Sequence, residues 1–339
     1  MTVTTMALLF AGSFLASLLF CGWARLYLLR RRVLDRPVER SVHLVPTPRG
    51  AGLAVVPILT LLWLFLPAFD PGAMALPRML VIGTILVSIV SWIDDLFGLP
   101  ALPRLGVQVL AVVLGLVALA QLPPVFQGWL PRPLDLALSG LLWLWFVNLF
   151  NFMDGSDTVA GGQALTVGLG LAAIAIDQGW VTGLTAAQGL TLAGVALGFL
   201  FWNRPPAKIF LGDVGSIPLG YLIGWLLLWA SSQGAWAAAL ILPAWFFADT
   251  TITLVKRAWR CAPLLEAHAE HSNSVAIKLG HSQARVAGLA LVANGALALL
   301  ALGAERDQQA LGLLGAAATV WLLMRKLKHP PKPPPVPVE

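Results

Sequence analysis

Charged side chains are scarce in this chain: of its 339 residues, 58% are hydrophobic and only 11% are charged. A soluble globular domain usually carries about 25% charged residues. The scarcity excludes an ordinary soluble fold and predicts an all-α polytopic membrane protein. The net charge of +6 does not indicate nucleic-acid binding, because the basic residues are sorted to one side of the predicted spans.

Cysteine is nearly absent as well. The two cysteines, Cys21 in an apolar run and Cys261 in a basic loop, exclude a disulfide framework and a cysteine metal cluster. No basic segment precedes the first apolar run, and the cluster RLYLLRRR follows it, so we expect an uncleaved anchor helix and not a signal peptide. The chain also lacks a repeat of 20–50 residues and the Gly-x-x-x-x-Gly-Lys loop of ordinary nucleotide hydrolases.

What the chain has instead is a series of long apolar runs. A membrane-spanning helix needs about 20 apolar residues. We expect about eleven spans, at residues 5–28, 51–69, 79–95, 105–123, 135–153, 160–177, 184–202, 215–232, 236–255, 285–303 and 309–324. They form one predicted transmembrane domain over residues 1–325, and the Pro-rich residues 326–339 are predicted to be an extended, disordered cytoplasmic tail.

Basic residues distinguish the two sides of the predicted spans. Of the 22 Lys and Arg residues, all except Arg78, Arg132 and Arg306 fall in loops or helix ends that follow odd-numbered spans. Cytoplasmic loops of membrane proteins are enriched in Lys and Arg. We therefore predict an N-terminus outside, a C-terminus in the cytoplasm, and a location in the bacterial inner membrane.

The polar clusters follow odd-numbered spans too. They are HLVPTPRGAG (43–52), DDLFGLPALPRLGVQ (94–108), NLFNFMDGSDTVAGG (148–162), NRPPAKIFLGDVGS (203–216), and the stretch from DTTITLVKR (249–257) to EAHAEHSNSVAIKLGHS (266–282). The adjacent acids Asp94 and Asp95 are unusual, because negative charge at a helix C-terminus opposes the helix dipole. Five polar loops on one side predict a composite active site at the cytoplasmic membrane surface.

Spacing within these loops indicates shared faces. Asn148, Asn151 and Asp154 are three residues apart, which would place them on one face at a helix end. Asp213 lies between Gly212 and Gly215, and small neighbours let a backbone approach a ligand closely.

Taken singly, several of these residues have simpler explanations. These are an Asp-Gly turn at 154–155, an N-cap at Asp213, interfacial polar residues at His268 and His271, an ion pair of Asp249 with Lys256, and a Pro-rich turn around Thr47 and Arg49. Their occurrence together on one side favours a site.

The residue types indicate the chemistry. Carboxylates and asparagines are hard oxygen ligands that suit Mg²⁺, with Mn²⁺ as the alternative cation. The neighbouring Arg, Lys and His side chains suit anionic groups. Acids, a divalent cation and bases together predict phosphoryl transfer, in which the protein mainly positions reactants and neutralises charge.

In this order, the motifs resemble those of the polyprenyl-phosphate N-acetylhexosamine-1-phosphate transferases, the glycosyltransferase 4 family, in its non-peptidoglycan branch. HLVPTPRGAG is similar to the family's His-x-x-Pro-Thr-Pro-Arg-x-Gly-Gly, and the Asp94–Asp95 pair is followed by Arg104 and Gln108 as in its Asp-Asp motif. NLFNFMDGSD and IFLGDVGS match two further motifs, and HAEH falls where the family keeps a His-rich loop. The resemblance covers nearly the whole chain and implies an eleven-span topology with the N-terminus outside.

The resemblance also implies a reaction. A UDP-N-acetylhexosamine would give its sugar-1-phosphate to undecaprenyl phosphate in a Mg²⁺-dependent step that releases UMP and begins a cell-surface glycan such as O-antigen. A homodimer is one option for the assembly. By the resemblance, Asp94 or Asp95 is the catalytic residue, Asp213 and Asp154 bind the metal, and the substrate-binding residues are Thr47, Arg49, Arg104, Asn148, Asn151, Asp154, Asp157, Lys208, His268 and His271.

The chain departs from the family pattern at a few positions. Ser156 and Thr158 replace an apolar residue and a glycine in the Asp-Gly-x-Asp segment, and Ala269 replaces an arginine. SNSV at 272–275 replaces aromatic, Gln and Arg residues. Loss of an arginine removes a bidentate phosphate clamp, and Thr158 is expected to obstruct or fill the pocket. These changes imply either an altered donor or a weakened enzyme.

Two other classes compete with the transferase. An intramembrane aspartyl protease would use Asp154 or Asp157 with Asp213, but it would leave Asp94 and Asp95 unexplained. A lipid or sugar-nucleotide transporter, or a degenerate binding homologue, would use the same polar residues without turnover, although the acids gather at one face and not through the midplane.

Overall fold

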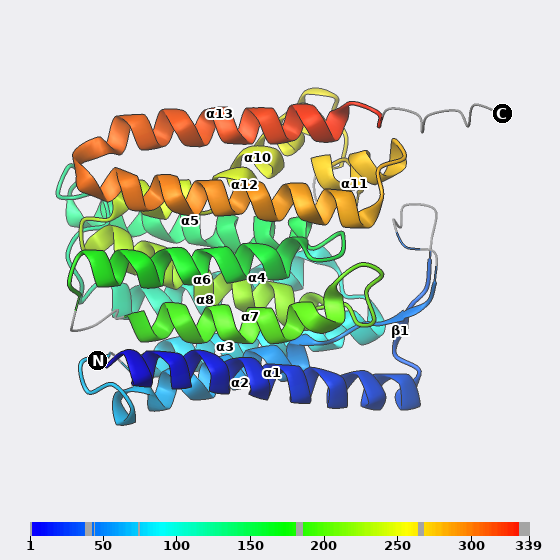
Figure 1. Cartoon of the computed structure of the whole chain (residues 1–339), viewed down its shortest axis with the longest axis horizontal. Helices are drawn as coiled ribbons and strands as arrows, with labels where there is room; N and C mark the ends of the chain where they lie inside the picture. Colours follow the sequence, from blue (N-terminus) through cyan, green and yellow to red (C-terminus); the bar gives the residue numbers. More distant parts are fainter. Residues whose placement is uncertain are drawn as a thin grey trace.

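The chain is a bundle of helices lying side by side along one long axis (Figure 1). We describe residues 2–37, 43, 45–73, 75–180, 186–263 and 268–331 of a computed structural model, apart from the side chains of residues 306 and 307. Within these residues, nine helices are long and apolar enough to cross a membrane. They are α1 (Val3–Arg31), α3 (Arg78–Phe97), α4 (Ala101–Leu119), α5 (Arg132–Met153), α6 (Val159–Asp177), α7 (Ala186–Asn203), α8 (Asp213–Ser232), α12 (Gln283–Gly303) and α13 (Gln309–Lys328). The prediction of an all-α polytopic membrane protein is confirmed.

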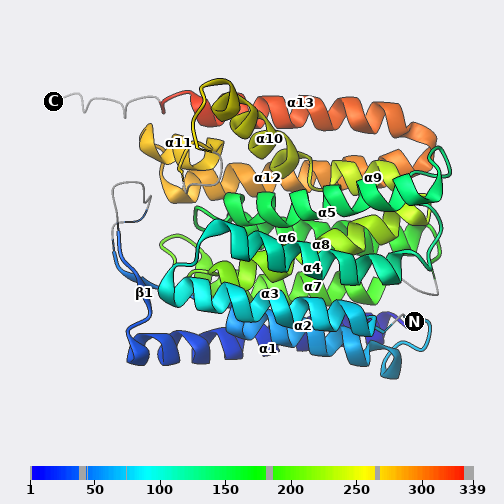
Figure 2. The same ribbon diagram turned by 180° about the vertical axis from the view of Figure 1, so that it is seen from behind.

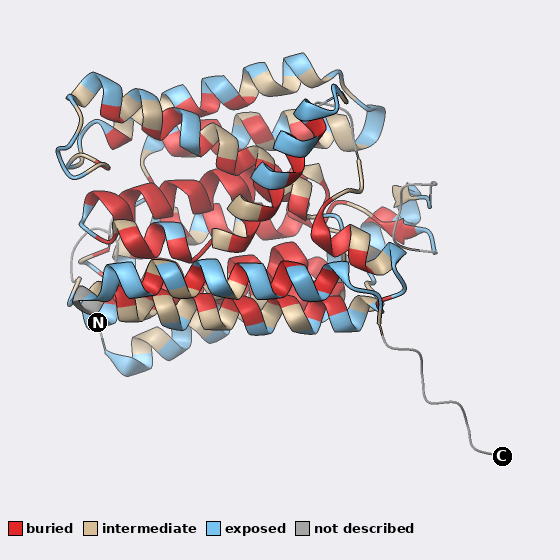
Figure 3. Cartoon of the chain, turned by 90° about the horizontal axis from the view of Figure 1, so that it is seen from above, coloured by how far each residue is buried: buried red, intermediate tan, exposed pale blue. Residues whose placement is uncertain are grey.

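The surface of the bundle is apolar and its centre is filled by one helix. Large side chains such as Leu8, Val292 and Leu299 are exposed over two thirds of their surface or more. Exposed apolar area of this extent would be a liability in water but matches a lipid environment. Every residue of α8 after Asp213 is buried. The outer helices show alternating buried and exposed positions (Figure 3).

Two expected spans differ from single long helices. The second is α2 (Gly52–Phe65) followed by the short 3-10 helix η1 (Leu66–Ala68). The ninth, expected as one helix over 236–255, is broken into α9 (Trp236–Ile241) and α10 (Ala244–Trp259). Pro243 causes the break, because proline has no amide hydrogen and its ring clashes with the preceding turn. Gln163 Nε2 donates a hydrogen bond of 2.9 Å to the Leu242 carbonyl, so the backbone at the break is satisfied inside the protein.

The C-terminal boundary also moves slightly. Helix α13 continues through Lys328, so its last three residues fall within the tail expected from residue 326 onward. Residues 332–339 of the expected tail lie outside the described part of the chain. A π-helical segment, η2 (Ala304–Gln308), joins α12 to α13.

One end of the bundle carries the polar loops, and we call it the polar end. It holds the segments that follow α1, α3, α5, α7 and α10, together with a small antiparallel hairpin of β1 (Leu34–Asp35) and β2 (Thr47–Pro48) and the short helix α11 (Ser272–Lys278). These segments lie at the right of Figure 1 and at the left of Figure 2. Loops far apart in the sequence therefore meet, as the sequence predicted.

Close packing of two helix starts fixes the geometry at this end. A Cβ atom on Gly52, at the start of α2, would lie 2.2 Å from the backbone nitrogen of Gly215 in α8. Only glycine permits this approach. The contact places Arg49, just before α2, beside Asp213, the first residue of α8.

Candidate active site

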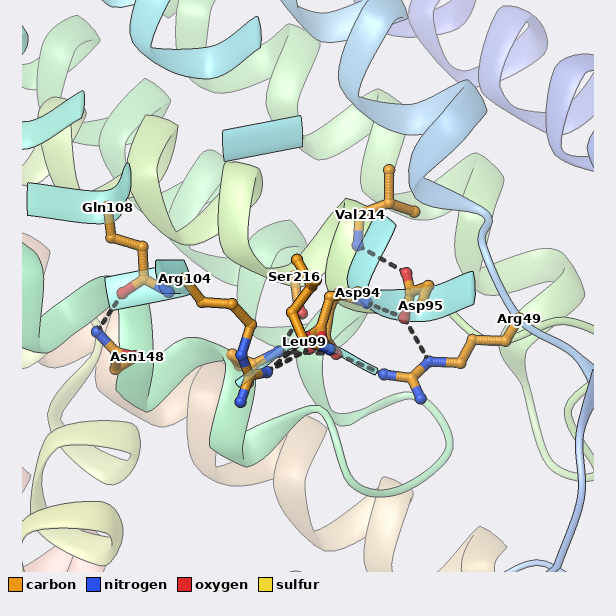
Figure 4. Close-up of polar contacts among 11 residues, drawn as sticks. Arg49, Asp94, Asp95, Leu99, Arg104, Gln108, Asn148, Val214 and Ser216 are labelled. Atoms are coloured by element: carbon orange, nitrogen blue, oxygen red, sulfur yellow. Dashed lines mark hydrogen bonds and ion pairs between the residues drawn. The ribbon is translucent and has the colours of Figure 1, made fainter. Parts of the chain in front are cut away.

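Asp95, at the end of α3, caps the start of α8. Its Oδ1 and Oδ2 atoms accept hydrogen bonds from the backbone nitrogens of Asp213 and Val214 at 3.1 and 2.9 Å (Figure 4). Its side chain is fully buried, and Arg49 Nε lies 2.8 Å from Oδ1. Gly212 precedes α8 at φ +75°, and a Cβ atom there would lie 2.8 Å from Asp95 Oδ2. The carboxylate is therefore held by the positive end of a helix and by one guanidinium.

Asp213 stands between two arginines. Arg49 Nη2 lies 2.5 Å from Asp213 Oδ1, and Arg104 Nη1 lies 3.5 Å from Oδ2. Asn151 Nδ2 donates to Oδ1 at 3.2 Å and to Ser216 Oγ at 2.8 Å. The sequence left open whether Asp213 caps α8 itself. The cap position is Gly212, and the carboxylate that receives the helix amides is that of Asp95.

Asp94 has a different environment from its neighbour. Arg104 Nη1 lies 2.5 Å from Asp94 Oδ2, and the Leu99 backbone nitrogen donates to Oδ1 at 2.6 Å. The Asp94 side chain keeps 8% exposure, whereas that of Asp95 has none. The two adjacent acids thus point to different helix neighbours, as the labelled side chains in Figure 4 show.

A polar cavity of about 230 Å³ opens beside this cluster. Its walls come from the hairpin, the end of α5, the following loop, the start of α8 and the loop before α11. The residues named from the sequence that line it are Arg49, Asn151, Asp154, Asp157, Asp213 and His268. Residues as far apart in the chain as Arg49 and His268 are therefore brought to one cavity.

Asp154 and Asp157 take separate roles in this wall. Asp154 follows the last residue of α5 and accepts no hydrogen bond from any described residue. Burial raises the pKa of the Asp154 carboxyl well above its ordinary value, Arg49 opposes this shift, and Asp213 adds to it. Asp157 accepts a bond of 2.9 Å from the Ala207 nitrogen; burial raises its pKa, and this amide and His43 oppose the rise. Asp154 therefore offers a carboxyl group to a ligand, whereas Asp157 ties two loops together.

Five predicted substrate-binding residues lie outside the cavity wall: Thr47, Arg104, Asn148, Lys208 and His271. Thr47 is buried in β2, and its hydroxyl donates to the Val45 carbonyl at 2.9 Å. The ammonium of Lys208 is exposed and lies 5.9 Å from the Trp202 ring centroid. Asn148 donates to Gln108 Oε1 at 2.8 Å, one helical turn before Asn151. The structure thus gives these residues supporting contacts and not positions on the cavity.

The last polar loop is organised by Asp249. This carboxylate in α10 has no exposed surface; its Oδ2 lies 3.2 Å from His271 Nδ1, and both of its oxygens accept from the Ser272 nitrogen at 3.1 Å. Asp249 thus caps α11 and orients the His271 ring. The suggested ion pair with Lys256 is wrong, because the partner of this buried carboxylate is His271.

The two histidines occupy different depths. His268 lines the cavity, whereas His271 is buried and does not. Phe152 packs on both rings at centroid distances of 6.0 Å, and the two histidine rings are 5.0 Å apart. His271 therefore supports the wall that His268 presents.

The departures from the family pattern contact one another. Asn273 Nδ2 donates to Ser156 Oγ at 2.9 Å and to the Met153 carbonyl at 3.3 Å. Ser156, Ala269 and Ser274 all line the cavity. Three of the substituted residues thus form a neutral part of the wall, and Asn273 is hydrogen-bonded to one of them, Ser156.

Thr158 stands apart from the Ser156–Asn273 contact. It does not line the cavity, so the expected obstruction of the pocket is wrong. Its φ of +73° explains why glycine suits this position. Its nitrogen donates to Asn203 Oδ1 at 2.8 Å, and its buried hydroxyl has no hydrogen-bond partner among the described residues.

Sequence reasoning missed Asp35, His43 and Gln283, which also line the cavity. His43 stood at the start of a recognised motif, and its ring packs on Phe210 at 4.9 Å. Asp35 and Gln283 lie outside the recognised motifs, so no signal in the sequence marked them.

The charges of the site favour a cation. Among the described residues, the acids Asp35, Asp154, Asp157 and Asp213 line the cavity, whereas the arginines and lysines contribute Arg49 alone. Burial alone would lower the pKa of Arg49, but Asp213, Asp95 and Asp35 raise it, so this side chain stays charged. No group of three or more metal-binding side chains occurs in the described ranges.

Magnesium usually takes only one or two protein carboxylates and fills its shell with water and phosphate oxygens. The Asp154 and Asp213 carboxylates and the Asn151 side-chain oxygen fit that requirement. They are hard oxygen donors at one wall of an acidic cavity.

Fold and site together define a polytopic membrane protein with a composite acid–arginine site at one end. Residues 77–231 match the family model described as glycosyl transferase family 4. The chain is 31% identical over 350 residues to decaprenyl-phosphate N-acetylglucosaminephosphotransferase of Mycolicibacterium smegmatis, covering 91% of this chain and 86% of that one. It is 30% identical over 257 residues to the probable undecaprenyl-phosphate N-acetylglucosaminyl 1-phosphate transferase of Bacillus subtilis, with 70% and 68% covered.

A phospho-N-acetylmuramoyl-pentapeptide-transferase of Picosynechococcus is 31% identical over 190 residues, which cover 51% of this chain and 50% of that one. The chain belongs to glycosyl transferase family 4, the polyprenyl-phosphate N-acetylhexosamine-1-phosphate transferases. The region matched by the family model includes Asp94, Asp95, Arg104, Asp154 and Asp213, but not Arg49 or Asp249.

Proposed function

We propose that this protein transfers an N-acetylhexosamine-1-phosphate from a UDP-sugar to undecaprenyl phosphate and releases UMP. The observation that carries the proposal is the cluster of Asp94, Asp213, Arg49 and Arg104 beside an acidic cavity, at one end of an apolar helix bundle. A lipid phosphate stays at the membrane surface and a nucleotide arrives from water, so a site at this boundary can hold both. The names of the similar proteins support the polyprenyl phosphate acceptor.

In the proposed reaction, an oxygen of the lipid phosphate attacks the sugar-linked phosphorus of the donor. A new phosphorus–oxygen bond forms to the lipid, and the bond from the same phosphorus to the bridging oxygen breaks, with UMP as the leaving group. Arg49 and Arg104 neutralise charge on the phosphates through their guanidinium groups. A bound Mg²⁺ would supply further neutralisation of phosphate charge, held by Asp154 and Asp213.

The geometry favours Asp94 over Asp95 as the group that accepts a proton from the lipid phosphate. Asp95 is fully buried, and its oxygens are engaged by two helix amides and Arg49. Asp94 retains exposure and is paired with Arg104. Asp95 would have to give up the hydrogen bonds that cap α8 in order to accept a proton, which would damage the fold. Asp94 can instead exchange its contact with Arg104 for a contact with a substrate phosphate.

We infer that the chain crosses the inner membrane eleven times, counting α2 with η1 and α9 with α10 as one crossing each. The N-terminus lies outside and the polar end faces the cytoplasm. The distribution of Lys and Arg residues supports this orientation. The cytoplasmic position of the site fits a UDP-sugar donor and a product that begins a cell-surface glycan of the O-antigen type.

Of the two explanations for the departures from the family pattern, an altered sugar donor or a weakened enzyme, we propose the altered donor. The supporting observation is that Ser156, which lines the cavity, is hydrogen-bonded to the buried Asn273, and both are departures from the family pattern. Random loss of function would not be expected to produce matched contacts. A carboxylate dyad of the aspartyl-protease type is disfavoured because Asp213 is held by two arginines and not by Asp154 or Asp157.

The test is UMP release by purified protein in detergent with undecaprenyl phosphate and a panel of UDP-N-acetylhexosamines, with and without Mg²⁺. We expect lipid-dependent and Mg²⁺-dependent release that Asp213→Asn reduces by at least a hundredfold, since it removes a charge held by two arginines. Folded protein that releases UMP with none of the donors, yet binds one of them, would replace the transferase with a binding homologue.

A further inference from the structure

A second hollow lies on the membrane side of the bundle, between α9–α10 and α13. We call it the α10–α13 groove. It has a volume of about 580 Å³ and shares no lining residue with the polar cavity. Its lining residues are Leu240, Ile241, Ala244, Ala248, Ile252, Lys256, Leu313, Ala316, Ala317, Val320, Trp321, Met324, Arg325 and Lys328.

The groove is amphiphilic along its length. Both α10 and α13 run toward the polar end. The lining residues at positions 313–324 of α13 therefore lie farther from that end than the basic residues at positions 325 and 328. At about 1.5 Å per residue, the lining stretch 313–328 extends roughly 22 Å along the bundle. The small side chains of Ala244, Ala248 and Ala317 leave the space open. The result is an apolar groove that extends over part of the roughly 30 Å hydrocarbon core of a bilayer, with three cations at one mouth.

These cations lack acidic partners in the described part of the chain. Lys256, Arg325 and Lys328 form no ion pair with a described carboxylate, although other basic residues at this end do, such as Arg257 and Arg260 with Glu270. Arg325 is instead placed over the Trp321 ring, 5.2 Å from its centroid. Tryptophan and arginine in this arrangement are typical of the membrane–water boundary. The three cations at the mouth of the groove therefore favour a ligand with an anionic headgroup.

We propose that the α10–α13 groove binds an anionic glycerophospholipid, with an acyl chain along the alanine-lined channel and the phosphate against Lys256, Arg325 and Lys328. An anionic lipid matches both halves of the groove, whereas a zwitterionic lipid matches only the apolar half. The lipid lies against α10, the helix in which Ala248 faces the groove and the next residue, Asp249, holds His271. Its binding thus buttresses the helix that organises the last polar loop.

The test measures lipid retention by native mass spectrometry after the protein is exchanged into nanodiscs of phosphatidylglycerol and phosphatidylcholine. We expect selective retention of phosphatidylglycerol. The triple variant Lys256→Gln, Arg325→Gln, Lys328→Gln is expected to weaken it on the order of a hundredfold, because each basic residue near an anionic surface contributes several-fold. The matched control is Arg30→Gln, Arg31→Gln, Arg32→Gln, which removes three exposed cations at the end of α1 and should leave retention unchanged.

A second pair of variants tests the apolar channel without touching charge. Ala317→Phe fills the groove from an exposed position and should displace the lipid, whereas Ala318→Phe, exposed on the same helix but outside the groove, should not. Equal retention of both lipids, or equal retention by all variants, overturns the proposal. So does retention of undecaprenyl phosphate in preference to phosphatidylglycerol, or a protein dimer that Ala317→Phe converts to monomer, since the occupant would then be the acceptor or a second copy.

Discussion

Two buried aspartates, Asp95 and Asp249, do the same structural work in two halves of the site. Each has a fully buried side chain, and each accepts backbone hydrogen bonds at the start of another helix, α8 for Asp95 and α11 for Asp249. Each also fixes one side chain, Arg49 in the first case and His271 in the second. The difference is the neighbouring residue: Asp95 is preceded by Asp94, whose side chain keeps 8% exposure, whereas Asp249 has no adjacent acid.

The comparison shows that a buried, helix-capping aspartate can position a reactive side chain without itself taking part in the reaction. In the α3–α8 half, positioning and proposed chemistry are divided between two adjacent acids. In the α10–α11 half, Asp249 and His271 do not reach the cavity. His271 is buried, and of the two histidines only His268 lines the wall. The predictions below test this division, beginning with the largest effect.

The largest effect should come from separating Asp94 from Asp95. Asp94→Asn is expected to lower kcat by about a thousandfold, the range for loss of a general base, with little change in the apparent melting temperature. Asp95→Asn should lower the melting temperature clearly, because a buried charge-assisted cap is lost. Steady-state kinetics and thermal unfolding in detergent check both. If Asp94→Asn keeps more than a tenth of the activity, the division of roles is wrong.

Next should come Asp249→Asn, which weakens the cap of α11 and the hold on His271. Hydrogen bonds to a charged group contribute about 1.5–3 kcal/mol. We expect KM for the UDP-sugar to rise roughly tenfold while kcat falls less, because the wall that presents His268 loosens. A double-mutant cycle with His271→Gln should show coupling between the two sites. Additive effects would mean that Asp249 acts on the fold independently of His271.

Thr158→Gly should stabilise the protein. A β-branched residue at φ +73° is strained by about 1–2 kcal/mol, and glycine removes that strain at a smaller entropic cost. We expect a net gain of about 1 kcal/mol, seen as a higher melting temperature, with unchanged turnover because Thr158 does not line the cavity. Thr166→Gly, in the middle of α6, is the matched control and should destabilise.

The smallest effect should come from Glu270, which pairs with Arg257 and Arg260. Burial acts to raise the pKa of Glu270, but hydrogen bonds from Arg260 and Arg257 outweigh it, so the folded-state pKa is lowered. Its stabilising effect is therefore present above the unfolded-state pKa and is lost as pH falls through the folded-state value. Because the carboxylate is exposed and screened, we expect only about 0.5 kcal/mol.

Thermal unfolding at pH 7 and at pH 3 checks this last prediction. Glu270→Gln should lower the melting temperature by a small amount at pH 7 and leave it unchanged at pH 3. An equal effect at both pH values would show that packing, and not charge, accounts for it.

The sequence by itself determined the membrane class, most of the spans and the gathering of polar loops at one end. These follow from apolar run length and from local motifs, which are properties of neighbouring residues. Membership of glycosyl transferase family 4 was also readable from the motifs, and the comparisons confirm it. The ninth span was predicted as one helix although Pro243 was visible, because hydropathy alone does not register a proline break.

Only the tertiary structure decided which acid does what. Asp94 and Asp95 are equivalent in a one-dimensional pattern, and their separation depends on the position of α8, which is more than a hundred residues away in the chain. The same holds for Asp249, whose partner is set by the packing of α11 and not by its own helix face. Hydrogen bonds and ion pairs act over about 3 Å, so their partners are fixed by the assembled bundle, whereas apolar periodicity is fixed by the chain itself.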